Sequence, residues 1–176
     1  MPQFIGIAGK AQSGKTTAAE IAASLTGGIV KSLAQPLYDM LDVLRTDDWP
    51  VDREQPIPGL ARSQRQLLQT LGTEWGRSMI SPTLWIEHLM HRCRWLAARQ
   101  VVFVPDVRFD NEAAAIIDAG GKVWGITGRG GIAGTHISED GIRFAYISRW
   151  LDNKGTLDDL RSQITAAVQE DIRHGA

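Results

Sequence analysis

Residues 4–16 read Phe4-Ile5-Gly6-Ile7-Ala8-Gly9-Lys10-Ala11-Gln12-Ser13-Gly14-Lys15-Thr16. The last eight of these residues satisfy the pattern Gly-x-x-x-x-Gly-Lys-[Ser/Thr], which is typical of a loop that wraps around phosphate groups. The apolar run before the loop predicts a buried strand, and residues 17–25 after it predict a helix with one apolar face. A strand, a glycine-rich loop and a helix in this order indicate a phosphate-binding loop (P-loop) rather than a chance glycine-rich turn.

Each residue type in this loop suits a contact with a nucleotide. Gly9 and Gly14 let the chain curl until backbone N–H groups point inward at phosphate oxygens. The following helix adds partial positive charge at its N-terminus, and Lys15 adds a full charge near the β- and γ-phosphates. The hydroxyl of Thr16 is placed to bind Mg²⁺. The predicted ATP-binding residues of this stretch are therefore Gly9, Ala11, Gln12, Ser13, Gly14, Lys15, Thr16 and Thr17.

Composition limits the partners that the chain is expected to have. The 176 residues carry a net charge of −1, so no global electrostatic field attracts the chain to nucleic acid or to a membrane surface. We find no apolar stretch of membrane-spanning length and no signal peptide before the first strand. The single cysteine, Cys93, excludes an internal disulfide and favours a reducing compartment. We expect a cytoplasmic chain without nucleic-acid or membrane partners.

Strands and helices alternate along the sequence, which predicts an α/β fold with a five-stranded parallel sheet covered by helices on both faces. The predicted strands are residues 4–8, 29–33, 101–104, 122–127 and 147–151. The predicted helices are residues 17–25, 35–44, 63–71, 83–98, 110–119 and 156–172. Gly72 is expected to interrupt the helix over 63–71. Because functional groups gather at the carboxyl ends of parallel strands, we expect the P-loop, Asp106, Arg129 and Asn153 to converge on one edge.

Asp106 and Arg108 follow the predicted strand at 101–104. An acidic residue at the end of a buried strand beside a P-loop commonly holds Mg²⁺ or its water shell. The planar guanidinium of Arg108 is suited to clamping a phosphate. The alternative is a helix-capping aspartate next to a surface arginine. We favour the functional interpretation because the end of the strand puts Asp106 beside the P-loop, which makes Thr16 and Asp106 the predicted metal ligands.

A cluster of arginines lies between residues 62 and 77, with little acid among them. A second anionic ligand needs such a cluster, and a nucleobase needs an aromatic face and amide donors. The side chains of Arg65, Gln69 and Arg77 would share a surface if the helix bends at Gly72. For each residue alone, a solvated helix face is the alternative interpretation.

Residues 128–134 contain four glycines around Arg129, which predicts a lid that closes over the transferring phosphoryl group and excludes water. His136 and Glu139 follow and would order the lid or shape the acceptor pocket. His136 has no metal-ligand spacing to the other histidines, which argues against a zinc site. Asn153 begins the stretch at residues 153–156, which is placed to line the adenine with backbone atoms. An ordinary surface loop is the alternative in both places.

Four motifs, taken together and in this order, resemble the phage-type deoxynucleoside monophosphate kinases. The motifs are residues 9–16, residues 65–77, Asp106-Val107-Arg108-Phe109-Asp110-Asn111-Glu112 and His136-Ile137-Ser138-Glu139. The resemblance implies the P-loop nucleoside monophosphate kinase fold, with a single kinase domain over residues 1–176. Its core would comprise residues 1–34 and 99–176, with an acceptor-binding helical insertion at 35–98 and a lid at 128–143.

The resemblance also implies transfer of the γ-phosphoryl group of ATP to a deoxynucleoside 5′-monophosphate, with Mg²⁺. The catalytic residues would be Lys15, Asp106, Arg108 and the lid cation Arg129, with Arg143 or Arg149 as a second lid cation. Glu112 would orient Arg108. On the acceptor side, Arg65 and Arg77 look like phosphate ligands. The full predicted substrate-binding set is Arg65, Gln69, Glu74, Trp75, Arg77, Glu112, His136 and Glu139.

Two other functions stay open at this point. The Asn-x-Gly-Thr stretch at residues 153–156 is also similar to the dephospho-coenzyme A kinases, which would keep the fold and the chemistry but change the acceptor. A non-catalytic P-loop module would instead use nucleotide to drive a partner interaction. The sequence does not reveal the accepted base, a preference for deoxyribose, or whether the chain forms a homodimer. If a phage encodes the chain, its location would be the host cytoplasm.

Overall fold

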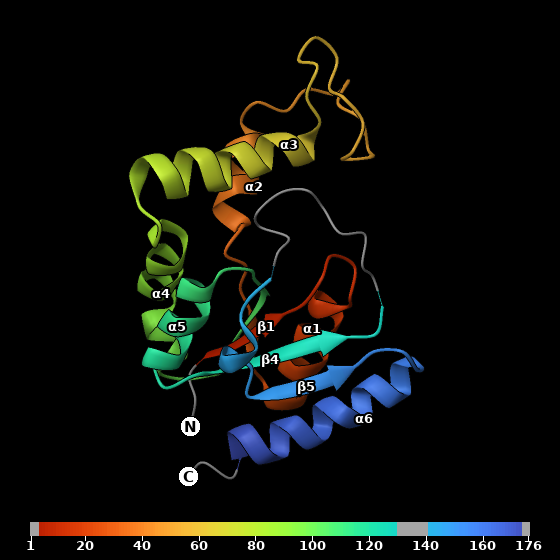
Figure 1. Cartoon of the computed structure of the whole chain (residues 1–176), viewed down its shortest axis with the longest axis vertical. Helices are drawn as coiled ribbons and strands as arrows, with labels where there is room; N and C mark the ends of the chain where they lie inside the picture. The colour runs from red at the N-terminus through yellow and green to blue at the C-terminus, as the bar shows by residue number, and fades with distance from the viewer. Residues whose placement is uncertain (1–3, 130–140, 174–176) are drawn as a thin grey trace. The chain divides into compact units, whose positions relative to one another are not determined.

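The computed structural model describes residues 4–129 and 141–173 (Figure 1). The chain divides into two compact units, each described here by itself. The core unit comprises Met1–Leu33 and Ile86–Ala176, and the helical unit comprises Ala34–Trp85. The predicted insertion at 35–98 therefore differs from the helical unit at its C-terminal end. Most of helix α4 (Leu84–Ala97) belongs to the core unit from Ile86 onward.

A five-stranded parallel sheet forms the centre of the core unit, as the sequence predicts. Its strands are β1 (Phe4–Ala8), β2 (Ile29–Val30), β3 (Val102–Val107), β4 (Lys122–Thr127) and β5 (Arg149–Asp152), in the order β2-β3-β1-β4-β5. The central strand β1 pairs with β3 and β4, so that Ile5 lies opposite both Phe103 and Lys122. The P-loop leaves the sheet at the carboxyl end of this central strand, between the ends of its two neighbours.

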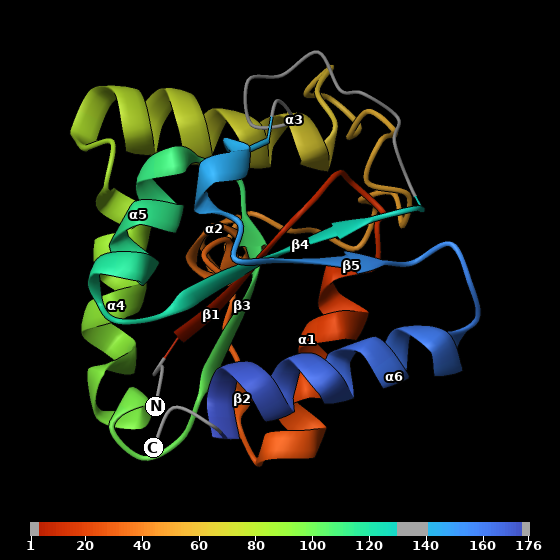
Figure 2. The same ribbon diagram turned by 60° about the horizontal axis from the view of Figure 1, so that its bottom comes forward.

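Helices cover both faces of the sheet (Figure 2). On one face lie α1 (Lys15–Thr26) and α6 (Leu157–Val168), and on the other lies α5 (Asp110–Asp118) with α4 beside it. The short helix η3 (Phe144–Tyr146) precedes β5, and the π-helical segment η4 (Gln169–Arg173) follows α6. Helix α1 ends at Thr26, one residue after the predicted end. Gly27 caps it, with a φ of 70° and a backbone N–H that donates to Ala23 O.

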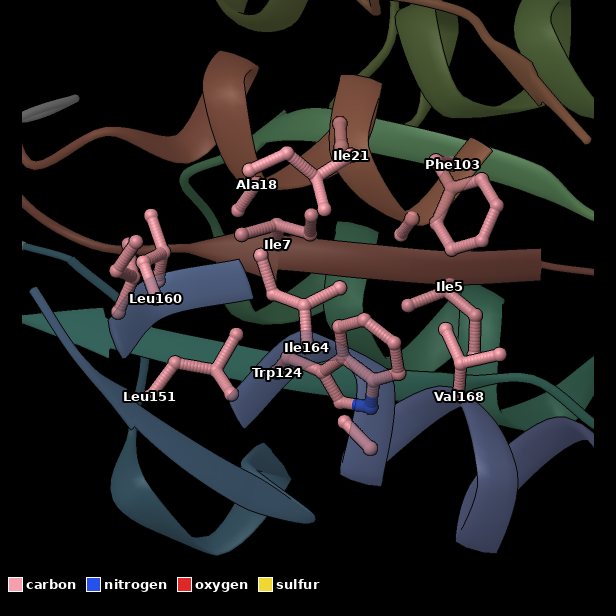
Figure 3. Close-up of a cluster of buried hydrophobic side chains, with 14 of the residues drawn as sticks. Ile5, Ile7, Ala18, Ile21, Phe103, Trp124, Leu151, Leu160, Ile164 and Val168 are labelled. Atoms are coloured by element: carbon pink, nitrogen blue, oxygen red, sulfur yellow. The ribbon is translucent and has the colours of Figure 1, made fainter. Parts of the chain in front are cut away.

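The main hydrophobic core fills the space between β1, α1 and α6 (Figure 3). Ile5 and Ile7 of β1 are fully buried in it, whereas Gly6 between them faces the opposite side. A Cβ on Gly6 would lie 2.8 Å from Cδ1 of Ile116 on α5. The period of two along a strand thus assigns alternate residues to the two helical layers. Burying each isoleucine stabilises the fold by about 1.5–3 kcal/mol, which holds β1 and hence the P-loop in place.

The helical unit is built on α2 (Gln35–Asp42), α3 (Gln64–Gln69) and the π-helical segment η1 (Thr70–Ile80). A capping box starts α3, because Ser63 N donates to Gln66 Oε1 at 2.9 Å and Gln66 N donates to Ser63 Oγ at 3.2 Å. The predicted interruption at Gly72 is wrong. The chain continues as η1, and Ser81 N donates to Gly76 O, five residues back, at 3.0 Å.

Candidate functional site

The P-loop has a backbone shape that needs glycine. Gly9 and Gly14 have φ angles of 154° and 96°, and Gln12 between them has φ of 61°. A Cβ on Gly9 would lie 2.6 Å from the backbone oxygen of Ile126 on β4, closer than real contacts allow. The loop therefore packs against the neighbouring strand at a position that has no room for a side chain on residue 9, and backbone groups of the loop can form the binding surface.

Lys15 lies across this loop. Its Nζ donates to Gly9 O at 2.9 Å and to Lys10 O at 2.7 Å. The same residue begins helix α1, whose first turn contains no acidic residue, and Thr16 and Thr17 are exposed in that turn. Backbone N–H groups at a helix N-terminus attract anions, so the ammonium group and the helix end favour the same ligand. This arrangement suits a phosphate.

Asp106 lies inside β3, which continues past the predicted end at residue 104. Its neighbour Val107 pairs with Ala8, the last residue of β1, so Asp106 lies beside the start of the P-loop. The carboxylate accepts a hydrogen bond from Ser32 Oγ at 2.6 Å and another from Leu33 N at 3.0 Å. Sequence reasoning missed Ser32. Its position just after β2, the strand next to β3, was the available signal.

The oxygen atoms of Thr16 and Asp106 are the type of ligand that Mg²⁺ prefers. Within residues 4–129 and 141–173 there is no group of three or more histidine, cysteine, aspartate or glutamate side chains that could hold a metal ion. Protein sites for Mg²⁺ with nucleotides commonly use one or two oxygen side chains, several waters and the phosphates. The two predicted ligands fit a site of that kind.

Arg108 is positioned through its backbone. Glu112 is buried on α5, and its Oε2 accepts from Arg108 N at 2.8 Å and from Phe109 N at 3.1 Å. These bonds cap α5 and fix the chain between β3 and the helix. Glu112 was predicted among the substrate-binding residues. Because its carboxylate is buried against the backbone, we infer that it contributes through the position of Arg108.

Arg129 and Asn153 come together with the P-loop at the carboxyl edge of the sheet. Arg129 Nε donates to Asn153 O at 3.0 Å, and its Nη2 donates to Gly155 O at 2.7 Å. The side chain of Asn153 donates from Nδ2 to Ser13 O at 2.9 Å. Three of the stretches that were predicted to converge are thus linked by hydrogen bonds.

Most of the predicted lid, including His136 and Glu139, lies outside the described residues. Its two candidate second cations pair with carboxylates of the core unit. Arg143 Nε lies 2.6 Å from Asp110 Oδ2, and Arg149 lies 2.6 Å from Glu170 and 3.1 Å from Asp171.

In the helical unit, one continuous helical segment carries the predicted acceptor residues of that unit. They are Arg65 and Gln69 on α3, and Glu74, Trp75 and Arg77 on η1. Arg65 forms an ion pair with Glu54, with 3.0 Å between Nη1 and Oε1, and its backbone N donates to Arg53 O at 3.1 Å. The structure thus adds Glu54, from a loop, as a partner that the sequence spacing did not indicate.

Trp85 holds this segment from one side. Its Nε1 donates to Gly72 O at 2.8 Å, and a Cβ on Gly76 would overlap the Trp85 indole ring. The Trp75 and Trp85 rings lie 6.2 Å apart at an interplanar angle of 43°. Because Gly76 has no side chain, the indole can approach the backbone closely at that position.

Comparisons with known proteins agree with the motifs. Residues 59–164 match the family described as deoxynucleotide monophosphate kinase. The chain is 32% identical over 194 residues to a protein of Acanthamoeba polyphaga mimivirus named "Putative deoxynucleotide monophosphate kinase". That similarity covers 94% of this chain and 95% of the viral protein. The matched range contains the motifs at 65–77 and 106–112 and begins after the P-loop.

Solved structures show the same fold at low sequence identity. A dephospho-CoA kinase from Campylobacter jejuni is similar with a TM-score of 0.56 and 15% identity over 100% of both chains. A sugar kinase from Janibacter sp. has a TM-score of 0.50 and 13% identity, covering 98% of this chain and 95% of its own. Among the described residues, no helix combines the length and the apolar character that a membrane span requires.

Proposed function

Since this chain belongs to the deoxynucleotide monophosphate kinase family, we propose that it phosphorylates a deoxynucleoside 5′-monophosphate to the diphosphate, with ATP and Mg²⁺. The observation that carries the proposal is the P-loop of the core unit. It is already curled around glycines, with Lys15 across it and Asp106 at the adjoining strand end. Membership of this family, together with a P-loop of this shape, favours phosphoryl transfer from ATP as the reaction.

The P-loop would bind the donor. The β- and γ-phosphates would take the place of the carbonyl oxygens that Lys15 contacts now, at Gly9 and Lys10. Thr16 and Asp106 would hold Mg²⁺, and the ion would neutralise part of the charge on the phosphates. The hydrogen bond from Ser32 keeps the Asp106 carboxylate oriented while it does so.

Arginines would bind the acceptor. The guanidinium groups of Arg65, Arg77 and Arg108 are suited to an acceptor monophosphate because each can donate two parallel hydrogen bonds. The attacking phosphate oxygen is already anionic, so the reaction needs no strong general base. Catalysis then consists of positioning the two phosphates in line and neutralising their charge.

An acceptor panel tests this proposal. ADP formation from ATP and Mg²⁺ would be followed with the four common deoxynucleoside monophosphates, their ribose counterparts and dephospho-coenzyme A. We expect fast turnover with at least one deoxynucleotide, and the same assay identifies the base. Turnover with dephospho-coenzyme A alone would reassign the acceptor. ATP binding without turnover on any acceptor would contradict a kinase and favour a nucleotide-binding module.

A further inference from the structure

Asn153 joins three segments at the carboxyl edge of the sheet. Its side chain reaches the P-loop through Nδ2 and Ser13 O, 2.9 Å apart. Its backbone N donates to Thr127 O at the end of β4 at 2.8 Å, and its backbone O accepts from Arg129 Nε. The residue is only 8% exposed. A carboxamide that is buried in this way and bonded to a backbone oxygen has a fixed orientation.

Two glycines make room for this residue. A Cβ on Gly14 would lie 2.5 Å from Nδ2 of Asn153, and a Cβ on Gly128 would lie 2.8 Å from its carbonyl carbon. Both glycines also have positive φ angles, 96° and 104°. The second glycine of the P-loop motif therefore has two roles here. It permits the turn, and it leaves the space that the Asn153 side chain fills.

The bond from Asn153 acts on the peptide group between Ser13 and Gly14. In a planar trans peptide the C=O and the following N–H point in opposite directions. Holding the Ser13 oxygen therefore also fixes the direction of the Gly14 N–H, one of the donors expected to face phosphate. The Ser13 hydroxyl cannot do this, because within the described residues its Oγ is buried without any hydrogen-bond partner.

We propose that Asn153 is a positioning residue of the P-loop, which orients the Ser13–Gly14 peptide for phosphate binding and does not read the adenine with its side chain. Arg129 holds the loop between β5 and α6 that carries Asn153, because it donates to the carbonyl oxygens of Asn153 and Gly155. The inference rests on the proposed binding of ATP to the P-loop and is independent of the acceptor. The expectation that residues 153–156 line the adenine with backbone atoms concerns other atoms and stays a prediction.

Binding measurements without any acceptor test this inference. Titration calorimetry would compare ATP, GTP and inorganic tripolyphosphate on the wild-type protein and on Asn153→Ala. A lost positioning bond should weaken tripolyphosphate and ATP by a similar factor, about tenfold for one hydrogen bond. The ratio of ATP to GTP affinity should not change. Unchanged tripolyphosphate affinity, or a change in the ATP-to-GTP ratio alone, would overturn the inference.

Gln163→Ala is the matched control. Gln163 is another amide that braces the same loop, because its Oε1 accepts from Asp152 N and its Nε2 donates to Asp152 O, each at 2.8 Å. It does not reach the P-loop by these bonds. If Asn153 merely stabilised the loop, both variants would affect ligand binding equally. We expect Gln163→Ala to bind tripolyphosphate as tightly as the wild-type protein does.

If the Asn153→Ala variant does not fold, Asn153→Asp provides a second test of the positioning role. It has the same shape but turns a carboxylate oxygen toward Ser13 O, so tripolyphosphate affinity should fall at least about tenfold below that of the wild-type protein. Wild-type affinity in this variant would overturn the inference. Failure of the acceptor panel would not affect these binding constants, whereas a wild-type protein that bound neither ATP nor tripolyphosphate would overturn both proposals.

Discussion

The phosphate loop of the core unit and the arginine-bearing helix of the helical unit are built in different ways. The loop is made of backbone groups, and glycines at 9 and 14 exclude side chains from it. The helix instead offers side chains, among them Arg65, which is paired with Glu54. A surface of backbone groups is specified by a few glycine positions. A surface of side chains is specified only when its partners are known.

The largest effect should come from Lys15→Ala, which removes the charged side chain that lies across the P-loop. We expect kcat to fall by about 10²–10³, the cost of losing one preorganised electrostatic contact to the transition state. Circular dichroism and the thermal midpoint should change little, because Lys15 is only half-buried. Lys10→Ala, which removes an exposed cation from the same loop, is the control. Near-normal turnover in a folded Lys15→Ala protein would contradict the assignment of the loop.

A pair of glycine variants tests how the helical segment is held. Gly76→Ala would drive a methyl group into the Trp85 ring and should destabilise the protein by about 1–3 kcal/mol, a typical cost of overpacking. Gly72→Ala should cost less, because its methyl would meet only the flexible Cδ1 of Leu37, 3.1 Å away. Urea unfolding followed by tryptophan fluorescence measures both. Equal effects would mean that the packing on Trp85 does not position the segment.

Asp171 tests whether stability of the core unit can change without a change in the loop. Burial alone would raise the pKa of this carboxyl, but hydrogen bonds from Arg149, Lys122 and Trp124 lower it below its usual value. A lowered pKa means that the folded state binds fewer protons than the unfolded state near that pH. This contribution to stability is present above about pH 4 and is lost as the pH falls through the folded pKa.

Asp171→Asn should therefore lower the free energy of unfolding at pH 7 by about 2 kcal/mol, because it weakens hydrogen bonds to charged groups. Unfolding curves between pH 2 and pH 7 should show a smaller pH dependence than in the wild-type protein. Glu170→Gln is the control, since the Glu170 side chain is 62% exposed and its pair with Arg149 should contribute little. Tripolyphosphate binding should be unchanged in both variants. A loss of binding would mean that the stability of the core unit and phosphate binding by the P-loop are not independent.

The difference between the P-loop and the arginine-bearing helix also explains which features could be predicted from the sequence. The strand, loop and helix at residues 4–26 and the parallel sheet follow from apolar runs and glycines that act locally. The predicted break at Gly72 was wrong: the chain continues as η1, and the backbone oxygen of Gly72 is held by a partner outside that segment, Trp85. Ser32 was missed for the same reason, since its bond to Asp106 joins residues 74 positions apart. Side-chain partners across such separations leave no periodic pattern.

The smallest effect should come from Glu54→Gln. The Arg65 and Glu54 side chains are 36% and 62% exposed, so their ion pair contributes at most about 1 kcal/mol. If Arg65 binds the acceptor phosphate, the Glu54 carboxylate competes for the same guanidinium, and its removal should lower the KM of the acceptor about two- to threefold. Steady-state kinetics should show an unchanged KM for ATP. Asp47→Asn removes an equal charge from the same loop, so an equal effect there would point to net charge instead. A higher acceptor KM in Glu54→Gln alone would mean that Glu54 orients Arg65 for binding, and the helix would then resemble the P-loop in being held ready before its ligand arrives.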